Sequence, residues 1–426
     1  MDIYTSMLAK IRSREGLERL SQLYSGRDGA LARQISRYSG VVKKHEEQFH
    51  CQERLDLISA PGRIEIIGNH TDHNNGRVLA AAVDLDTLCA ISPREDLMVH
   101  IVSDGFPTLE ISLDSLEPRE EEQGKSAALV RGVAKGMADR GYRIGGFDAV
   151  MVSDVASGSG LSSSAAYEVL IAKALDHLYN GDRMHSTERA QISQYAENVF
   201  FGKPSGLMDQ MACSTGGLVY IDFKDEPQVE ALSYRFGEHG YDIVVVNTRS
   251  SHDDLTDAYA AIRREMNAVA AFFGKKVLRE VRPEEIWKNI GQLRCQLGER
   301  PVLRAVHFFE ENQRVKKLVR DVRAEDTASI LSAILASGDS SQKLLQNVFV
   351  PGVSQPVSLA LMVASRFLQG KGAWRVHGGG FAGTTLNIVP SDMTGEFVEQ
   401  MNSIFGKDSC YVLDVRREGP CVVLSI

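Results

Sequence analysis

The stretch from Asp154 to Leu170, DVASGSGLSSSAAYEVL, constrains the fold and the chemistry of this chain more than any other segment. An apolar strand over 147–155 precedes it and a helix over 162–179 follows, so the glycine- and serine-rich part forms the turn between them. Glycine accepts backbone angles at which a Cβ would clash, and the first turn of a helix leaves its N–H groups unpaired. The candidate residues for binding an anion at this turn are Ser157, Gly158, Ser159, Gly160, Leu161, Ser162, Ser163 and Ser164.

Two interpretations of this turn stay open on the pattern alone. Converging amides, the positive end of the helix dipole and nearby hydroxyl groups favour a bound phosphate. A turn of glycine and serine before a helix is also common without a ligand, and in that case Ser162 caps the helix. The other segments of the chain have to decide between these interpretations.

Length and composition limit the class of protein. The chain has 426 residues, more than one hydrophobic core usually holds, so we expect two domains. With 56 acidic against 48 basic residues, neither nucleic acid nor a membrane surface is the expected partner. No run of about twenty apolar residues and no signal-peptide pattern is present, which predicts a cytoplasmic protein. The 6 cysteines lack C-x-x-C spacing, so they indicate neither a zinc site nor a disulfide framework, and we expect buried side chains.

A polar segment between two strand-like runs is the second notable feature. Residues 57–86 read LISAPGRIEIIGNHTDHNNGRVLAAAVDLD, in which β-branched runs flank the turn-forming NHTDHNNG. An ordinary long hairpin would explain this pattern. Alternatively, His70, Asp72 and His73, with Arg63 nearby, gather enough hydrogen-bonding and titrating groups to bind a polar ligand or a metal ion.

Asp209 is the third candidate, because it lies among apolar and small residues in GKPSGLMDQMACSTGG. This segment follows an expected helix over 186–201. A carboxylate among hydrophobic side chains is costly to bury without a partner, so Asp209 is either a helix-capping acid or a functional one.

The order of the remaining elements predicts an α+β fold rather than a doubly wound one. Residues 1 to about 50 have the apolar spacing of an amphipathic helical region and suggest no chemistry. After Gly217, LVYIDF and YDIVVVNT read as strands, 253–273 and 284–335 as helices, and HGGGFAGTTLNIVP as a glycine cluster that leads into a strand. At the C-terminus, CYVLDV and PCVVLSI read as two strands of one sheet.

Three separated segments together resemble the GHMP small-molecule kinases, and within them the galactokinase family. APGRIEIIGNHTDHNNGRVL is similar to the sugar-binding signature of galactokinases, SGSGLSSSAA to their phosphate-binding loop and HGGGFAGTT to their third glycine-rich motif. The resemblance implies a two-domain GHMP kinase fold, with an N-terminal α+β domain, a ferredoxin-like C-terminal domain and the active site between them. We expect a helical extension over 1–50, which lies outside the resemblance, and domains over 51–216 and 217–426.

The resemblance implies transfer of a phosphate group from ATP, with Mg²⁺, to the anomeric hydroxyl of a galactose-like sugar, by a monomer or a dimer. By motif position, Asp209 corresponds to the catalytic aspartate and Arg63 to the arginine beside it. A carboxylate there accepts the hydroxyl proton, while a guanidinium stabilises developing negative charge and keeps the acid ionised. Ser164 and Glu197 correspond to the magnesium-ligating pair, whose hard oxygen atoms suit Mg²⁺.

The residues implied to bind the sugar are Asn69, His70, Asp72, His73, Gly206 and Tyr259. Galactokinases carry a glutamate where this chain has Asn69 and usually a tyrosine where it has His73. Plant galacturonate kinases also lack the glutamate and also have the histidine. An amide at this position would no longer repel a carboxylate on carbon 6. Because the rest of the signature is intact, galactose is the predicted substrate. The alternatives are a galacturonokinase or other carbon-6-altered sugar 1-kinase, and a sugar- and ATP-binding sensor without turnover.

Overall fold

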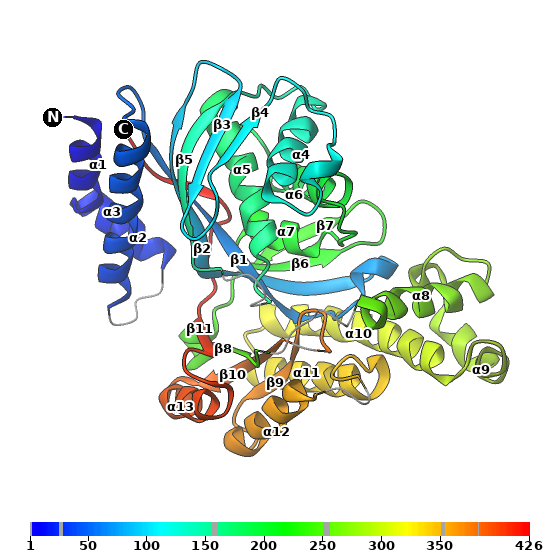
Figure 1. Ribbon diagram of the computed structural model, residues 1–426. Coiled ribbons are helices and arrows are strands. Elements are labelled where there is room, and N and C mark those ends of the chain that lie inside the picture. Colours follow the sequence, from blue (N-terminus) through cyan, green and yellow to red (C-terminus); the bar gives the residue numbers. More distant parts are fainter. Residues whose placement is uncertain (1, 25–28, 156–159, 250–255, 351–353, 382) are drawn as a thin grey trace.

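Two long antiparallel strands, β1 (Asp56–Ile67) and β2 (Arg77–Pro93), form the centre of the fold and confirm the two strand-like runs predicted from the sequence. The computed structural model describes residues 2–24, 29–155, 160–249, 256–350, 354–381 and 383–426. The pair crosses the middle of the molecule, and its tip lies beside α8 (Thr256–Phe272) and α10 (Glu299–Arg323) (Figure 1).

Within the described residues, the larger sheet has eight strands, in the order β12-β1-β2-β5-β3-β4, and β6 pairs with β2 and β7 with β6. The further strands of this sheet are β3 (Met98–Ser103), β4 (Leu109–Ser112), β5 (Phe147–Ser153), β6 (Leu218–Asp222), β7 (Gln228–Leu232) and β12 (Cys421–Ser425). Four helices cover one face of it: α4 (Ser126–Ala138), α5 (Ser163–Asn180), α6 (Ser186–Tyr195) and α7 (Met208–Thr215). The helix expected after the serine-rich turn is therefore confirmed as α5.

Successive residues of a strand point to opposite faces, so the central strands serve two cores. Ile58 and Cys89 pack under α4 to α7, whereas Leu57 and Leu88 pack against the N-terminal helices. These helices are α1 (Ile3–Ile11), α2 (Arg14–Leu23) and α3 (Ala30–Phe49). They confirm the helical character predicted for this region, and they cover the face of the sheet opposite α4 to α7 (Figure 1).

The second sheet has four antiparallel strands in the described part of the chain, in the order β11-β8-β10-β9. Its strands are β8 (Tyr241–Asn247), β9 (Ala373–His377), β10 (Thr384–Pro390) and β11 (Cys410–Leu413). The other helices of this half are α9 (Pro283–Leu297), α11 (Thr327–Ser340), α12 (Pro356–Leu368) and α13 (Thr394–Phe405). A continuous core that includes Ile64, Val245 and Val319 joins both sheets through α10 and α11.

The α+β class is confirmed, but the two C-terminal strands differ from the prediction. They do not lie in one sheet, because β11 pairs with β8 while β12 pairs with β1. The chain crosses between the sheets beside β2, where Val415 bridges to Val83. Strands β6 and β7 also belong to the larger sheet although they follow residue 217, and the division of the chain into domains there stays a prediction.

Burial of the cysteines is also less uniform than predicted. Cys89 and Cys213 are buried, but Cys295 is exposed and Cys51, Cys410 and Cys421 are partly exposed. The prediction of buried side chains is therefore wrong for Cys295, which lies on a helix surface. Among the helices that the structure describes, none is both long and apolar enough to cross a bilayer.

Candidate active site

The three glycine-containing segments, far apart in the sequence, meet at one place. The backbone N–H of Arg63 donates to the Leu161 carbonyl over 3.0 Å, which ties β1 to the turn before α5. A Cβ on Gly160 would lie 2.5 Å from Thr384 Oγ1 and 3.2 Å from His377 Nδ1, so only glycine lets this turn approach the third segment. The sugar-signature segment, the serine-rich turn and the third glycine segment thus form a single site.

Arg63 and Asp209 form a bidentate ion pair inside this site. Arg63 Nε and Nη2 donate to Asp209 Oδ1 and Oδ2 over 2.8 and 2.7 Å, and Nη1 donates to the Gly160 carbonyl over 2.5 Å. Burial opposes ionisation of Asp209, but the charge and hydrogen bonds of Arg63 outweigh it and hold its pKa below the ordinary value. The site therefore holds an ionised carboxylate that can accept a proton at neutral pH.

Ser162 lies at the first position before α5 but does not cap the helix. Its backbone is left-handed, with a φ of 58°, and its side chain accepts no hydrogen bond from the helix. Its hydroxyl instead donates to Asp209 Oδ2, so Ser162 occupies the N-cap position but its side chain does not cap the helix. Leu161 is buried, whereas Ser163 and Ser164 are partly exposed in the first turn of α5. Three further candidates, Ser157, Gly158 and Ser159, lie outside the described residues.

A cluster of carboxylates lies beside the start of α5. Ser164 Oγ donates to Glu197 Oε1 over 3.0 Å, and Lys203 Nζ lies 3.1 Å from the same oxygen. Gln210 Nε2 donates to Glu197 Oε2 over 2.7 Å and to Glu168 Oε2 over 3.0 Å. Burial, and then the charge of Glu197, raises the pKa of Glu168 well above its ordinary value, which indicates a neutral acid. Ser164 and Glu197 thus offer hard oxygen atoms of the kind that Mg²⁺ prefers.

Glu197 and Gln210 reach this cluster from two different elements. Glu197 lies on a π-helical turn, Ala196–Phe201, that continues α6, and such turns are frequent at functional sites. Gln210 directly follows Asp209 in the first turn of α7. The sequence analysis missed Gln210 and Lys203, although both lie in GKPSGLMDQMACSTGG, the segment that contains Asp209.

The tip of the β1–β2 pair brings Asp72 and His73 close to the chain before α7. Asp72 Oδ1 accepts a hydrogen bond from the His73 N–H over 2.9 Å, and a Cβ on Gly206 would lie 2.0 Å from Asp72 Oδ2. His70 Nε2 lies 2.9 Å from the Gly379 carbonyl. Burial, and then the neighbouring His73, lowers the pKa of His70 to about 4, so His70 is neutral at pH 7. Three predicted sugar-binding residues of this loop and Gly206 therefore lie together.

Tyr259 lies against the third glycine segment. Its hydroxyl donates to the Gly380 carbonyl over 2.7 Å, and its ring meets Phe381 edge to face with centroids 5.3 Å apart. Burial raises the pKa of Tyr259 to about 12, which keeps the phenol protonated. The helix α8 thereby contributes a hydroxyl group beside Gly379 and Gly380, the segment that also contacts His70.

Asn69 is buried, with 1% of its surface exposed, and protein groups engage its amide. Nδ2 donates to the Gly378 carbonyl over 2.6 Å and lies 3.2 Å from both carboxylate oxygens of Glu65. Oδ1 accepts from Asn347 Nδ2 over 2.6 Å. Asn69 thus bridges the signature segment and the third glycine segment, and its contact with a sugar stays a prediction.

Helix α10 holds the backbone of the signature loop, a role that the sequence analysis did not predict. His307 Nε2 donates to the Asn69 carbonyl over 2.9 Å, because a carbonyl can only accept. Glu311 Oε1 accepts from the Gly68 N–H over 2.9 Å, and Asn312 Oδ1 from the Arg77 N–H over 2.8 Å. His307 and Glu311, one helical turn apart, hold the start of the loop at Gly68 and Asn69, and Asn312 holds its end at Arg77.

The metal-site interpretation of His70, Asp72 and His73 gains no support. Within the described residues, no group of three or more His, Cys, Asp or Glu side chains is arranged to hold a metal ion. The geometry of the loop instead favours binding of a polar ligand.

Comparisons with known proteins agree with this geometry. Family models match residues 43–93, as the galactokinase galactose-binding signature, and residues 128–217, as the GHMP kinases N terminal domain. A galactokinase of Actinobacillus pleuropneumoniae is 34% identical over 335 residues, which cover 78% of this chain and 85% of that protein. A galactokinase of Streptomyces coelicolor is 31% identical over 356 residues, which cover 82% of this chain and 89% of that protein.

Solved structures extend the agreement to the fold. The crystal structure of Lactococcus lactis galactokinase complexed with galactose has a TM-score of 0.78 and 26% identity, and covers 90% of this chain and 99% of that one. A mevalonate kinase shares the fold, with a TM-score of 0.60 and 15% identity, and the match covers 85% of this chain and 99% of that one. The fold and the converging segments are those of the GHMP small-molecule kinases. Within this class, the chain belongs to the galactokinase family.

Proposed function

We propose that this protein is an ATP-dependent sugar kinase that phosphorylates the anomeric hydroxyl of galactose. The observation that carries the proposal is the Arg63–Asp209 pair, which lies where the three family segments meet. Membership of the galactokinase family supports the same reaction and the same sugar.

In the proposed reaction, the anomeric oxygen of the sugar attacks the γ-phosphorus of ATP and the bond from phosphorus to the ADP oxygen breaks. The hydroxyl proton passes to Asp209, whose low pKa keeps it ionised beforehand. Arg63 holds the carboxylate with two hydrogen bonds and stabilises negative charge near the Gly160 carbonyl. Most of the rate enhancement comes from positioning and charge stabilisation around the phosphoryl group.

The start of α5 is the proposed site for the ATP phosphates, together with residues 157–164. Ser164 and Glu197 are the proposed Mg²⁺ ligands, and their oxygen atoms lie 3.0 Å apart. A hydroxyl and a carboxylate are hard oxygen donors of the kind that Mg²⁺ prefers, so this pair fits the ion. When bound, Mg²⁺ would neutralise phosphate charge during transfer.

The proposed sugar site is formed by His70, Asp72, His73, Gly206 and Tyr259, together with Asn69, which precedes His70 in the same loop. We expect Gly206→Ala to raise the KM for the sugar about tenfold or more, because the new Cβ would displace the Asp72 carboxylate. Steady-state kinetics with each substrate varied in turn measures this. Gly395→Ala is the matched control, since its Cβ meets nothing within 4 Å. An unchanged KM for the sugar in Gly206→Ala would argue against the proposed role of Asp72.

Asn69 gives a specific reason to test a carbon-6-oxidised sugar such as galacturonate. Residue 69 carries no charge, and the nearest carboxylate, Glu65, pairs with Arg375 at 3.4 Å. Coupled assays of ADP formation with galactose and galacturonate at matched concentrations decide between the two substrates. We expect at least a hundredfold preference for galactose in kcat/KM, about 2.7 kcal/mol. A preference for galacturonate would reassign the substrate, and no ADP formation with any sugar would favour a sensor.

A further inference from the structure

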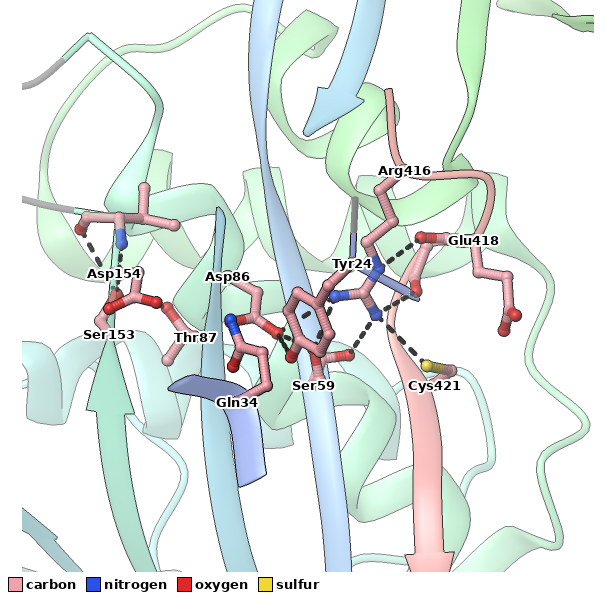
Figure 2. A network of polar contacts seen from close by, with 12 residues as sticks. Tyr24, Gln34, Ser59, Asp86, Thr87, Ser153, Asp154, Arg416, Glu418 and Cys421 are labelled. Carbon is pink, nitrogen blue, oxygen red and sulfur yellow. Dashed lines mark hydrogen bonds and ion pairs between the residues drawn. The ribbon is translucent and has the colours of Figure 1, made fainter. Parts of the chain in front are cut away.

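The N-terminal helices meet the larger sheet at a buried charged cluster around Asp86 of β2 (Figure 2). Asp86 is fully buried and accepts hydrogen bonds from Tyr24 Oη over 2.6 Å and from Arg37 Nη1 over 2.5 Å. Ser59 and Arg416 also donate to it. Burial opposes ionisation of Asp86, but Arg37 and Arg416 hold its pKa below the ordinary value. An ionised buried carboxylate needs such partners, and the N-terminal helices supply two of the four.

A second carboxylate, Asp154, extends this cluster toward the active site. Arg33 Nη2 lies 2.8 Å from Asp154 Oδ1, and Arg37 Nη1 lies 3.4 Å from Asp154 Oδ2. The Asp154 N–H donates to the Asp86 carbonyl over 2.9 Å, so both carboxylates share one backbone link. In Figure 2, Asp154 lies beside Ser153 and Thr87 at the end of β5. Helix α3 thus holds the end of β5 through two arginines.

The position of Asp154 in the chain gives these contacts a consequence for the active site. The chain passes from Asp154 through Val155, which is buried, to Gly160 and the start of α5. A Cβ on Gly62 would touch both Val155 and the Leu161 carbonyl, so Val155 lies beside the turn that receives Arg63. On β1, Ser59 contacts Asp86. Arg63, four residues after Ser59 on the same strand, contacts Asp209. The charged cluster and the active site are therefore linked twice, through β1 and through the chain that follows β5.

We propose that Arg33 and Arg37 are positioning residues for nucleotide binding: they hold the end of β5 and thereby order the segment Gly160–Ser164 that receives the ATP phosphates. The inference rests on the proposed ATP site. A phosphate-binding turn that is ordered in advance loses less conformational freedom when its ligand binds. The helical extension is in this way part of the kinase, and it affects the affinity for ATP rather than the affinity for the sugar.

The test measures binding of a non-hydrolysable ATP analogue with Mg²⁺ to the full chain, by isothermal titration calorimetry without sugar. The Arg33 side chain is 56% exposed, so we expect Arg33→Ala to leave the fold intact. We expect Arg33→Ala to raise the Kd of the analogue about fivefold, and Arg33→Lys to keep it within about twofold of wild type. Asp154→Asn removes the ion pairs of both Arg33 and Arg37, so it should raise the Kd at least as much, and the double variant should add little to it, because Arg33 acts through Asp154.

The matched control is Lys44→Ala, which removes another ion pair of α3, that with Asp104 in the β3–β4 connection. It should leave the Kd of the analogue unchanged, and galactose affinity should be unchanged in every variant. An unchanged Kd in Arg33→Ala and Asp154→Asn would overturn the inference, as would equal losses for sugar and analogue. Analogue binding without phosphotransfer to any sugar would refute the proposed function alone, whereas a wild-type chain that binds no analogue would refute both.

Discussion

Asp209→Asn should lower kcat about 10²–10⁴-fold, the range expected when a positioned proton acceptor is removed. The amide keeps the size of the side chain and still bonds to Ser162, but it cannot take the hydroxyl proton. Sugar binding, measured by calorimetry without ATP, should stay within about fivefold of wild type. The combination of lost turnover and retained binding identifies Asp209 as the group that acts in the chemical step.

Asp148→Asn is the matched control for this experiment. Asp148 also accepts two hydrogen bonds from one arginine, Arg94, at 3.0 and 3.1 Å, but it lies at the start of β5 away from the three converging segments. The substitution Asp148→Asn should lower Tm without changing kcat more than about twofold. Turnover that survives in Asp209→Asn would mean that the proton passes to another group or to water.

Arg63→Met should lower kcat about 10²–10³-fold or more and move the acidic limb of kcat/KM to higher pH. The sign follows from Asp209: burial raises its pKa, and Arg63 lowers it most, ahead of the hydrogen bond from Ser162 and the charge of Lys203. Without the guanidinium, the largest effect opposing burial is lost, so Asp209 takes up a proton at a higher pH than in wild type. A pH–rate profile, with Tm recorded at each pH, measures the shift.

Arg63→Lys separates charge from geometry. A lysine keeps the positive charge but not the fork that binds both oxygens of Asp209, so kcat should fall while the acidic limb stays near its wild-type position. If the limb of Arg63→Met does not move, the group titrating in kcat/KM is not Asp209.

The sequence predicts the reacting parts of the site because each belongs to a short local pattern. Arg63 follows a glycine in a strand, Ser164 follows a glycine-rich turn, and Asp209 lies in an apolar segment next to Gly206. The structure brings Arg63 and Asp209 into contact, as it does Ser164 and Glu197, and these contacts agree with the roles that the resemblance implied. Their catalytic and metal-binding roles stay predictions until the variants are measured.

The supporting residues could not be predicted in this way. His307 and Glu311 lie on α10, where a polar residue reads as an ordinary solvent-facing position until the signature loop packs against it. Arg37 likewise lies in a region that reads as an amphipathic helix, and its importance follows only from Asp86, which is distant in sequence. The sheet to which β12 belongs was predicted wrongly for the same reason, because strand pairing is decided by the packing of the whole chain.

The pairing of β12 with β1 has a consequence for the order in which this protein folds during synthesis. Leu57 of β1 pairs with Leu424 of β12, and Arg416, just before β12, completes the partners of Asp86. The ribosome makes β1 early and β12 late, so the nascent larger sheet has an open edge while α8 to α13 are being translated. The larger sheet, which begins with β1, is therefore completed only after the last strand, β12, has been synthesised.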